Sequence, residues 1–141
     1  MVETIDMQAM RYINLFSKVS NVSTTKVFVY NNQIVYAVPK AKVSMAIGKN
    51  AVNAKKLSDI LRKKIKIVAM PAIDDNDGIG KFIEDVVSPV EFNKIEVNDS
   101  SVVITAGRNS KAALIGRNRL REKELAEVLK NFFHIGKLRI A

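Results

Sequence analysis

The sequence predicts an α+β protein made of two small domains of one kind. Apolar residues recur first at the spacing of a helix and then in the alternating pattern of strands. The segment AIGKN (residues 46–50) returns as LIGRN (residues 114–118), 68 residues later, and the order of predicted elements returns with it. A chain of 141 residues has room for two domains of roughly 70 residues each.

The first half of the chain predicts the order helix, strand, strand, helix, helix, strand. Residues 1–20 carry an apolar stripe at helical spacing, formed by Ile5, Ala9, Tyr12, Ile13, Phe16 and Val19. Segments 26–30 and 33–38 are rich in Val, Ile, Tyr and Phe, which favour strands. They flank Asn31 and Asn32, two residues that tolerate positive φ, so a two-residue hairpin is predicted.

Two helices and a strand are predicted to complete this domain. Residues 40–47 form a short helix after Pro39, and Gly48 marks its end. The next helix is expected to turn Val52, Leu57, Ile60 and Leu61 inward, with Lys55, Lys56, Arg62 and Lys63 outward. Residues 65–69 then predict a half-buried strand.

The second half repeats this order after a short linker at residues 72–78, so domain boundaries of 1–72 and 73–141 are predicted. A helix over 79–87 is followed by strands over 90–97 and 101–106. A helix over about 110–115 precedes the second glycine turn. The last helix places Leu125, Val128, Leu129 and Phe132 on one face, and Leu138 and Ile140 indicate a final strand.

Each glycine turn is a candidate site for an anion. Two helices joined so tightly need glycine at the joint, because a left-handed backbone is costly for a residue with a Cβ. Lys49 and Arg117 follow the two glycines directly. A cation beside a helix N-terminus with free N–H groups favours a phosphate. A nucleic-acid backbone is the expected ligand.

The charge distribution favours the same interpretation. The net charge of +9 arises from a surplus of +9 in residues 1–72 (12 basic, 3 acidic), −6 in residues 73–99 (2 basic, 8 acidic) and +6 in residues 100–141 (9 basic, 3 acidic). Basic charge therefore accompanies both glycine turns, and a polyanion would be steered toward them. The competing interpretation is that lysine-rich helices are simply well solvated.

Several other classes are disfavoured by the composition. The chain has no cysteine, which excludes disulfides and thiolate metal sites, and no apolar run long enough for a membrane span or signal peptide. A cytoplasmic protein without cofactor, metal, membrane or small-molecule substrate is expected. Three aspartates in residues 72–78 invite a calcium loop, but Ile73 stands where its first ligand should be. Gly78 and Gly80 lack the third glycine of a dinucleotide motif.

Catalysis is not expected. His134 is the only histidine, and acidic residues avoid the turns, so no nucleophile and base pair can be assembled from obvious parts. His134 is expected to be structural.

The repeated unit resembles the type II KH domain on the residues IGKN (47–50) and IGRN (115–118). More narrowly, AIGKNAVNAKKL and LIGRNRLREKEL resemble the tandem KH segments of the NusA family of transcription factors. The resemblance covers nearly the whole chain and is closest to short archaeal NusA-like proteins. The domains of bacterial NusA that bind polymerase and carry an OB fold have no counterpart in this sequence. The implied fold is two tandem type II KH domains, each a three-stranded sheet with helices on one face.

The resemblance implies binding of single-stranded RNA, whose backbone a KH loop clamps over about four nucleotides. The residues carried over are Gly48, Lys49, Asn50 and Ala51 in the first loop, Gly116, Arg117, Asn118 and Arg119 in the second, and Lys55. Both loops depart from the GxxG pattern in fourth place, where Ala51 is a small change and Arg119 a larger one. Base-facing groove positions would be Ile47, Val52, Val68 and Ile115, each of which is also a candidate core residue.

Two binding functions remain open. One is a factor for transcription elongation, termination or antitermination, with RNA polymerase as a possible second partner. The other is an accessory protein of the ribosome or of RNA processing, because KH pairs serve several assemblies and fold does not decide function.

Overall fold

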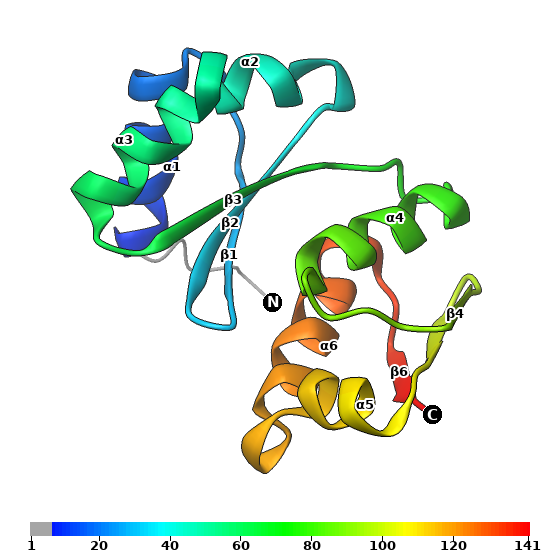
Figure 1. Cartoon of the computed structure of the whole chain (residues 1–141). Coiled ribbons are helices and arrows are strands. Elements are labelled where there is room, and N and C mark those ends of the chain that lie inside the picture. The colour runs from blue at the N-terminus through cyan, green and yellow to red at the C-terminus, as the bar shows by residue number, and fades with distance from the viewer. Residues whose placement is uncertain (1–6) are drawn as a thin grey trace. The chain divides into compact units, whose positions relative to one another are not determined.

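The computed structural model describes residues 7–141, which divide into two compact units at Ala69 and Met70 (Figure 1). The domain boundary expected from sequence lies after residue 72. Residues 1–6, including Ile5 of the predicted stripe, lie outside the described part. The described residues hold six α-helices and two three-stranded sheets, an α+β architecture that is compatible with KH-like folds.

Unit 1 has the predicted order of elements. They are α1 (Met7–Ser20), β1 (Lys26–Tyr30), β2 (Gln33–Val38), the 3₁₀ helix η1 (Lys40–Lys42), α2 (Val43–Ile47), the 3₁₀ helix η2 (Lys49–Ala51), α3 (Val52–Leu61) and β3 (Lys64–Ala69). The hairpin between β1 and β2 turns through Asn31 and Asn32, with φ of 50° and 63°. β2 lies in the middle of the sheet, antiparallel to β1 and parallel to β3.

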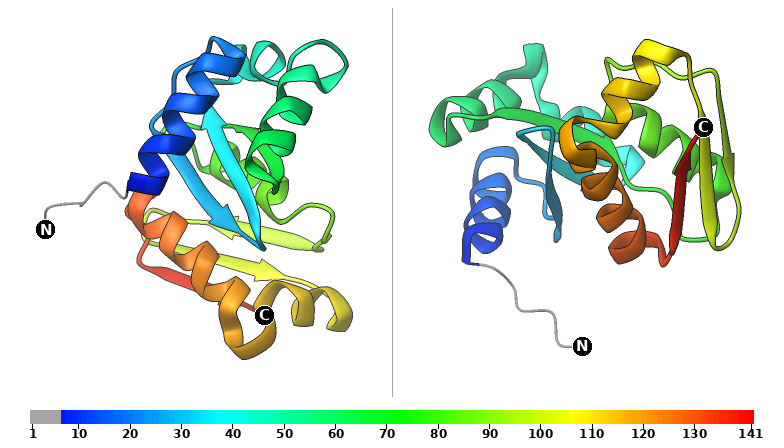
Figure 2. Two further views of the ribbon diagram at one scale, coloured as in Figure 1. Left: turned by 90° about the vertical axis from the view of Figure 1, so that its left-hand side faces the viewer. Right: turned by 90° about the horizontal axis from the view of Figure 1, so that it is seen from below.

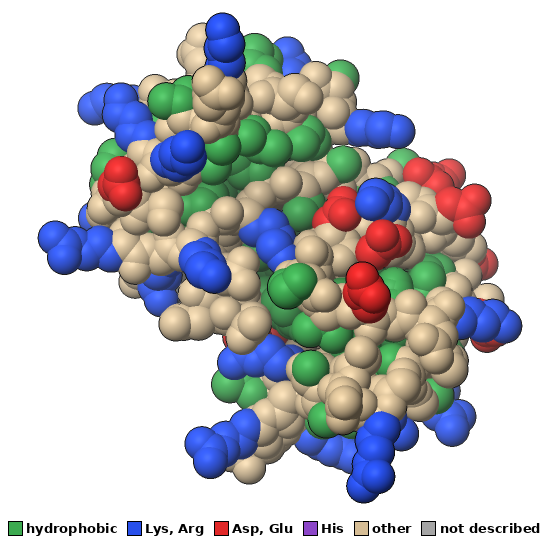
Figure 3. All heavy atoms as spheres, in the orientation of Figure 1, with side chains coloured by type: hydrophobic (Ala, Val, Ile, Leu, Met, Phe, Trp, Pro, Cys, Tyr) green, Lys and Arg blue, Asp and Glu red, His purple; other side chains and the backbone are tan. Residues whose placement is uncertain are grey.

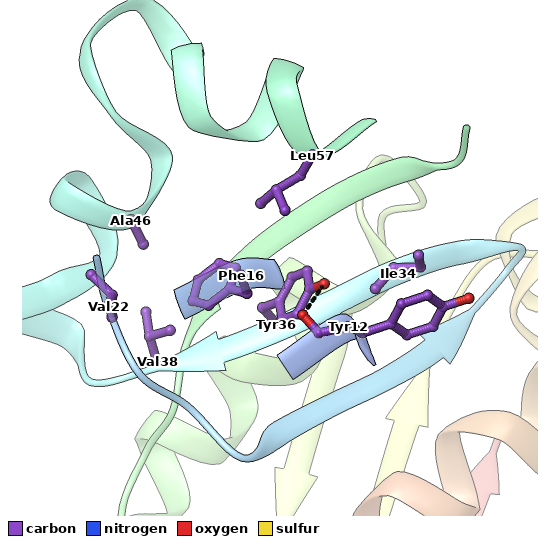
Figure 4. Packing of buried hydrophobic residues seen from close by; sticks show 8 residues of the cluster. All are labelled: Tyr12, Phe16, Val22, Ile34, Tyr36, Val38, Ala46 and Leu57. Atoms are coloured by element: carbon purple, nitrogen blue, oxygen red, sulfur yellow. Dashed lines mark hydrogen bonds between the residues drawn. The ribbon is translucent and has the colours of Figure 1, made fainter. Parts of the chain in front are cut away.

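The core of unit 1 lies between the sheet and its helices (Figure 2). Residues of α1, α2 and α3, and Val22 from the loop between α1 and β1, pack with the buried side chains of β2 (Figure 4). The cluster consists of Tyr12, Phe16, Val22, Ile34, Tyr36, Val38, Ala46 and Leu57. The rings of Phe16 and Tyr36 stack with centroids 4.2 Å apart. The Tyr36 hydroxyl donates to the Tyr12 carbonyl oxygen at 2.9 Å, which satisfies a polar group inside this core.

Unit 2 repeats the arrangement. Its elements are α4 (Asn76–Val87), β4 (Lys94–Val97), β5 (Ser101–Thr105), α5 (Arg108–Ile115), the 3₁₀ helix η3 (Arg117–Arg119), α6 (Leu120–Phe133) and β6 (Lys137–Ile140). β5 lies in the middle, antiparallel to β4 and parallel to β6. Phe82 of α4 meets Phe133 of α6 edge to face, with ring centroids 5.3 Å apart, inside the core of this unit.

Several predicted boundaries were wrong. The helix predicted from residue 79 begins at Asn76, because the Asp75 carboxylate caps it by accepting from the Gly78 amide at 3.0 Å. The strand predicted from residue 90 begins at Lys94, since the Val90 amide donates to the Val87 carbonyl in a turn. The single helix predicted over 40–47 is divided into η1 and α2.

Three residues that were predicted to face the core, Val52, Ile60 and Phe132, are not buried. Val52 and Ile60 are 54% and 45% exposed, so only part of the apolar stripe on α3 is covered. On α6 it is Phe133 that is buried, while Phe132 is only partly covered. Phe133 continues the i, i+4 series of Leu125 and Leu129, which is the stripe that faces the core.

Candidate nucleic-acid interface

The first glycine turn joins α2 to α3 within four residues, 48–51. Gly48 ends α2 with φ +81° and ψ 166°, a conformation that glycine adopts readily and residues with a Cβ rarely adopt. Asn50 and Ala51 then follow in the left-handed region, with φ of 56° and 59°. The Ala51 amide donates to the Gly48 carbonyl at 3.0 Å, which closes the turn immediately before Val52 begins α3.

The second turn has the same backbone. Gly116 has φ +74° and ψ 172°, and Asn118 and Arg119 have φ of 55° and 61°. The Arg119 amide donates to the Gly116 carbonyl at 3.1 Å. Two segments 68 residues apart therefore build one backbone shape from partly different residues.

Both glycines are also required by space. A β-carbon on Gly48 would lie 2.9 Å from Cγ1 of Val52, and one on Gly116 would lie 2.5 Å from Cγ of Arg121. Real contacts are not that short, so with any other residue the side chain that it meets, and at Gly116 also the backbone nitrogen of Arg121 at 3.0 Å, would have to shift.

Each turn opens onto a helix N-terminus that no side chain caps. The N-cap residues are Ala51 for α3 and Arg119 for α6, and neither makes a side-chain capping hydrogen bond. Residues that normally cap helices are Ser, Thr, Asp and Asn, whose oxygen accepts from a free amide. The Val52 and Leu120 amides donate to the Lys49 and Arg117 carbonyls. An anion would therefore face the following amides of each first turn and the positive end of the helix dipole.

The predicted polar residues of the first turn are accessible. Lys49, Asn50 and Lys55 are exposed, and Ala51 is half-buried. Within residues 7–141, neither Lys49 nor Lys55 has an ion-pair partner, and the first turn of α3 holds no acidic residue. The positive charge of this turn is therefore not neutralised by a carboxylate of the described chain.

The second turn carries more charge, and part of it is paired. Arg117 is exposed and has no ion-pair partner in the described residues. Arg119 lies 3.8 Å from the Glu122 carboxylate, measured from Nη1 to Oε1. Arg121 pairs with Glu124 in the same i, i+3 relation. The two turns share a backbone but differ in the carboxylates beside them.

The apolar residues proposed as groove positions are found in three kinds of environment. Ile47 and Ile115 are half-buried at the helix ends before the glycines. Val52 is exposed beside the turn, whereas Val68 is only 4% exposed, as the alternative of a core residue predicted. Val68 lies on β3, paired with Ala37 of the central strand, where it is covered.

Sequence reasoning missed two exposed apolar residues near the turns. Leu120 is 48% exposed and follows the second turn as Val52 follows the first. The 68-residue repeat aligns these two positions and could have identified Leu120. Met45, also 48% exposed, lies in the last turn of α2.

A hollow of about 560 Å³ in unit 2 was also absent from the sequence reasoning. It lies beside α6 and β6, the strand at one edge of the sheet. Its lining comes from β5, α6 and the chain around β6: Ser101, Val102, Val103, Glu122, Lys123, Ala126, Gly136, Lys137, Leu138 and Arg139. The hollow thus combines apolar side chains, the edge strand β6 and three cations, Lys123, Lys137 and Arg139.

Other kinds of site find little support in the described residues. Within residues 7–141, no group of three or more His, Asp or Glu side chains is placed to hold a metal ion. Asp75, from the aspartates that invited a calcium loop, caps α4. His134 ends α6 with a left-handed backbone, φ +57°. None of the helices in residues 7–141 combines the length and apolar character needed to cross a bilayer.

No family model matches the chain, and its similarities to known proteins are distant. The probable transcription termination protein NusA of Methanococcus vannielii is 27% identical over 108 residues, which cover 74% of this chain. The match spans 60% of that protein, so less than two thirds of its length is represented. The crystal structure of APE1850 is 26% identical, with a TM-score of 0.66, over 97% of this chain and 100% of that one. The sequence similarity is thus to a NusA-like protein, and the fold recurs along nearly the whole chain in a solved structure.

Proposed function

We propose that this protein binds single-stranded RNA through two KH-type units and has no catalytic activity. The observation that carries the proposal is the pair of glycine turns with one backbone shape, each opening an uncapped helix beside an exposed cation. A phosphate would accept from the free amides and face Lys49 or Arg117.

The apolar surfaces beside the turns would receive the bases. Val52 and Leu120 offer exposed aliphatic side chains next to each turn, against which an unstacked base could pack. In unit 2 the hollow between α6 and β6 adds an open strand edge, whose backbone groups can hydrogen-bond base edges. Phosphate contacts would position the strand, and these neighbouring surfaces would contact its bases.

The acidic segment is not expected to bind RNA, which favours binding at the glycine turns. Residues 73–99 carry eight acidic and two basic residues. Carboxylates gather over α4 (Figure 3), where Lys81 is already engaged by Glu84 and Asp85 at 3.7 and 3.2 Å. This surface would repel a polyanion.

The proposed cellular role is in transcription elongation, termination or antitermination, with RNA polymerase as a second candidate partner. The similarity to a protein named for transcription termination supports this role. The alternative is an accessory function on ribosomes or in RNA processing. Copurification of the protein with RNA polymerase or with ribosomal particles would distinguish the two.

The decisive experiment is titration of short single-stranded RNAs against the wild type and Lys49→Asp/Asn50→Asp. Aspartate tolerates the left-handed conformation of Asn50, so the turn should keep its shape. We expect the variant to lose at least about tenfold in affinity, and the wild type to weaken steeply with salt because several phosphates are neutralised.

The matched control is Lys18→Asp/Asn21→Asp at the end of α1. It makes the same change of charge, and Asn21 also has a left-handed backbone, φ 62°. Equal affinity of the turn variant and the wild type, or an equal loss in the control, would remove the first turn from RNA binding. Arg117→Asp/Arg119→Asp should cause a smaller loss, because Glu122 and Glu124 already place two carboxylates beside the second turn.

A further inference from the structure

Glu122 is the one carboxylate among the residues that line the hollow in unit 2. Three cations share that lining: Lys123, Lys137 and Arg139. The Glu122 side chain is 22% exposed, so it is largely withdrawn from bulk water but still open to the hollow. A carboxylate on a surface that binds RNA repels the phosphates. It favours binding only if it accepts a hydrogen bond from another part of the ligand.

The first unit has no such group. The 68-residue repeat aligns Glu122 with Ala54 of α3, just as it aligns Lys123 with Lys55. The carboxylate is thus a feature of the second unit alone, placed where α6 borders the hollow.

The ion pair with Arg119 leaves Glu122 available. Their closest atoms are 3.8 Å apart, and the Arg119 side chain is 72% exposed. Exposed pairs of this kind contribute little because solvent screens them. An RNA phosphate near the turn would compete for Arg119, and the Glu122 carboxylate would then be released from this ion pair.

We propose that Glu122 selects the base held in the hollow of unit 2 by accepting a hydrogen bond from an exocyclic amino group. This inference rests on the proposed RNA binding. A carboxylate accepts from the N4 amino group of cytosine and equally from the N6 amino group of adenine. Uracil presents carbonyl oxygens at both positions that flank its ring N–H, and those oxygens face the carboxylate unfavourably. The second unit therefore prefers bases with an exocyclic amino group, of which cytosine and adenine are tested below, over uracil.

Glu122 also has a structural role. A carboxylate in the first turn of a helix interacts favourably with the helix dipole, and Glu122→Ala removes that interaction, an effect that the melting temperature measures. Base preference is a readout that a purely structural role would not change.

The experiment measures the affinity of the wild type and of Glu122→Ala for octamers of cytidine, adenosine and uridine. The wild type should bind the cytidine or adenosine octamer about five- to tenfold more tightly than the uridine octamer, and Glu122→Ala, which leaves no acceptor at this position, should remove most of that preference. Amide chemical shifts of Ala126 and Leu138 report binding at the hollow itself, independently of the first unit.

The matched control is Glu127→Ala on the same helix, where an exposed carboxylate that does not line the hollow is removed. It removes the same charge and should leave the base preference unchanged. If Glu122→Ala raises affinity for all three octamers equally, Glu122 only repels phosphate and the selection is refuted. A preference unchanged by Glu122→Ala also refutes it while leaving RNA binding intact. Failure of the wild type to bind any octamer would instead overturn the proposed function.

Discussion

Asn53 donates a hydrogen bond from Nδ2 to the Met45 carbonyl oxygen at 3.2 Å, across the first glycine turn. The bond joins the first turn of α3 to the last turn of α2, so the corner is held from both sides. The same side chain would lie 3.0 Å from a β-carbon on Gly48. A side chain at position 48 would therefore collide with Asn53, whose hydrogen bond to Met45 joins the two helices at this turn.

Gly48→Ala should destabilise unit 1 by about 1–3 kcal/mol, because the methyl group meets Val52 and Asn53 and the backbone keeps a positive φ. RNA affinity should fall with it, since α3 must shift. Urea unfolding and RNA titration measure the two effects.

Gly136→Ala is the control for that substitution, because a β-carbon there meets nothing within 4 Å. Its stability should change little. Equal stability of Gly48→Ala and the wild type would show that the turn relaxes without cost.

Ala51→Gly should stabilise the protein by about 0.5–1 kcal/mol. Ala51 has φ +59°, and a left-handed residue with a Cβ costs roughly 1–2 kcal/mol relative to glycine, part of which is offset by the greater entropy of glycine in the unfolded chain. The free energy of unfolding in urea tests this.

Ala54→Gly is the matched substitution on regular α3, three residues further along, and should destabilise by about 1 kcal/mol. Opposite signs for the two substitutions are the expected result. The same sign for both would contradict strain at Ala51.

The stability of the protein should decrease at high pH through Tyr36. Burial, and to a smaller extent neighbouring Tyr12, raise the pKa of Tyr36 above its ordinary value. The folded state then keeps a proton that the unfolded state loses above about pH 10. Stability from this group is fully present below that pH and decreases as the pH rises further.

Tyr36→Phe should weaken this alkaline decrease, at a cost of about 1 kcal/mol at neutral pH for the lost hydrogen bond to the Tyr12 carbonyl. Urea unfolding between about pH 8 and 11 compares the two slopes. Parallel slopes for the two proteins would mean that the Tyr36 hydroxyl ionises in the folded state as readily as in the unfolded chain.

The sequence by itself determined the order of elements, the hairpin at Asn31 and Asn32, and the two glycine turns. These features depend on residues close together in the chain: the period of apolar positions, the tolerance of asparagine for positive φ, and the glycine between two helices. The 68-residue repeat then predicted that the second half would copy the first, and the two sheets have the same strand order.

Only the tertiary structure decided which part of each apolar stripe is covered and which charges are neutralised. Periodicity places Val52 and Ile60 on the apolar side of α3, but their exposure depends on how far neighbouring elements reach. The left-handed backbone of Ala51 and Arg119 follows from closing the turn, against the preference of both residues. The hollow beside Glu122 joins strands and a helix that are distant in sequence, and such a site forms only when a sheet edge and a helix pack together.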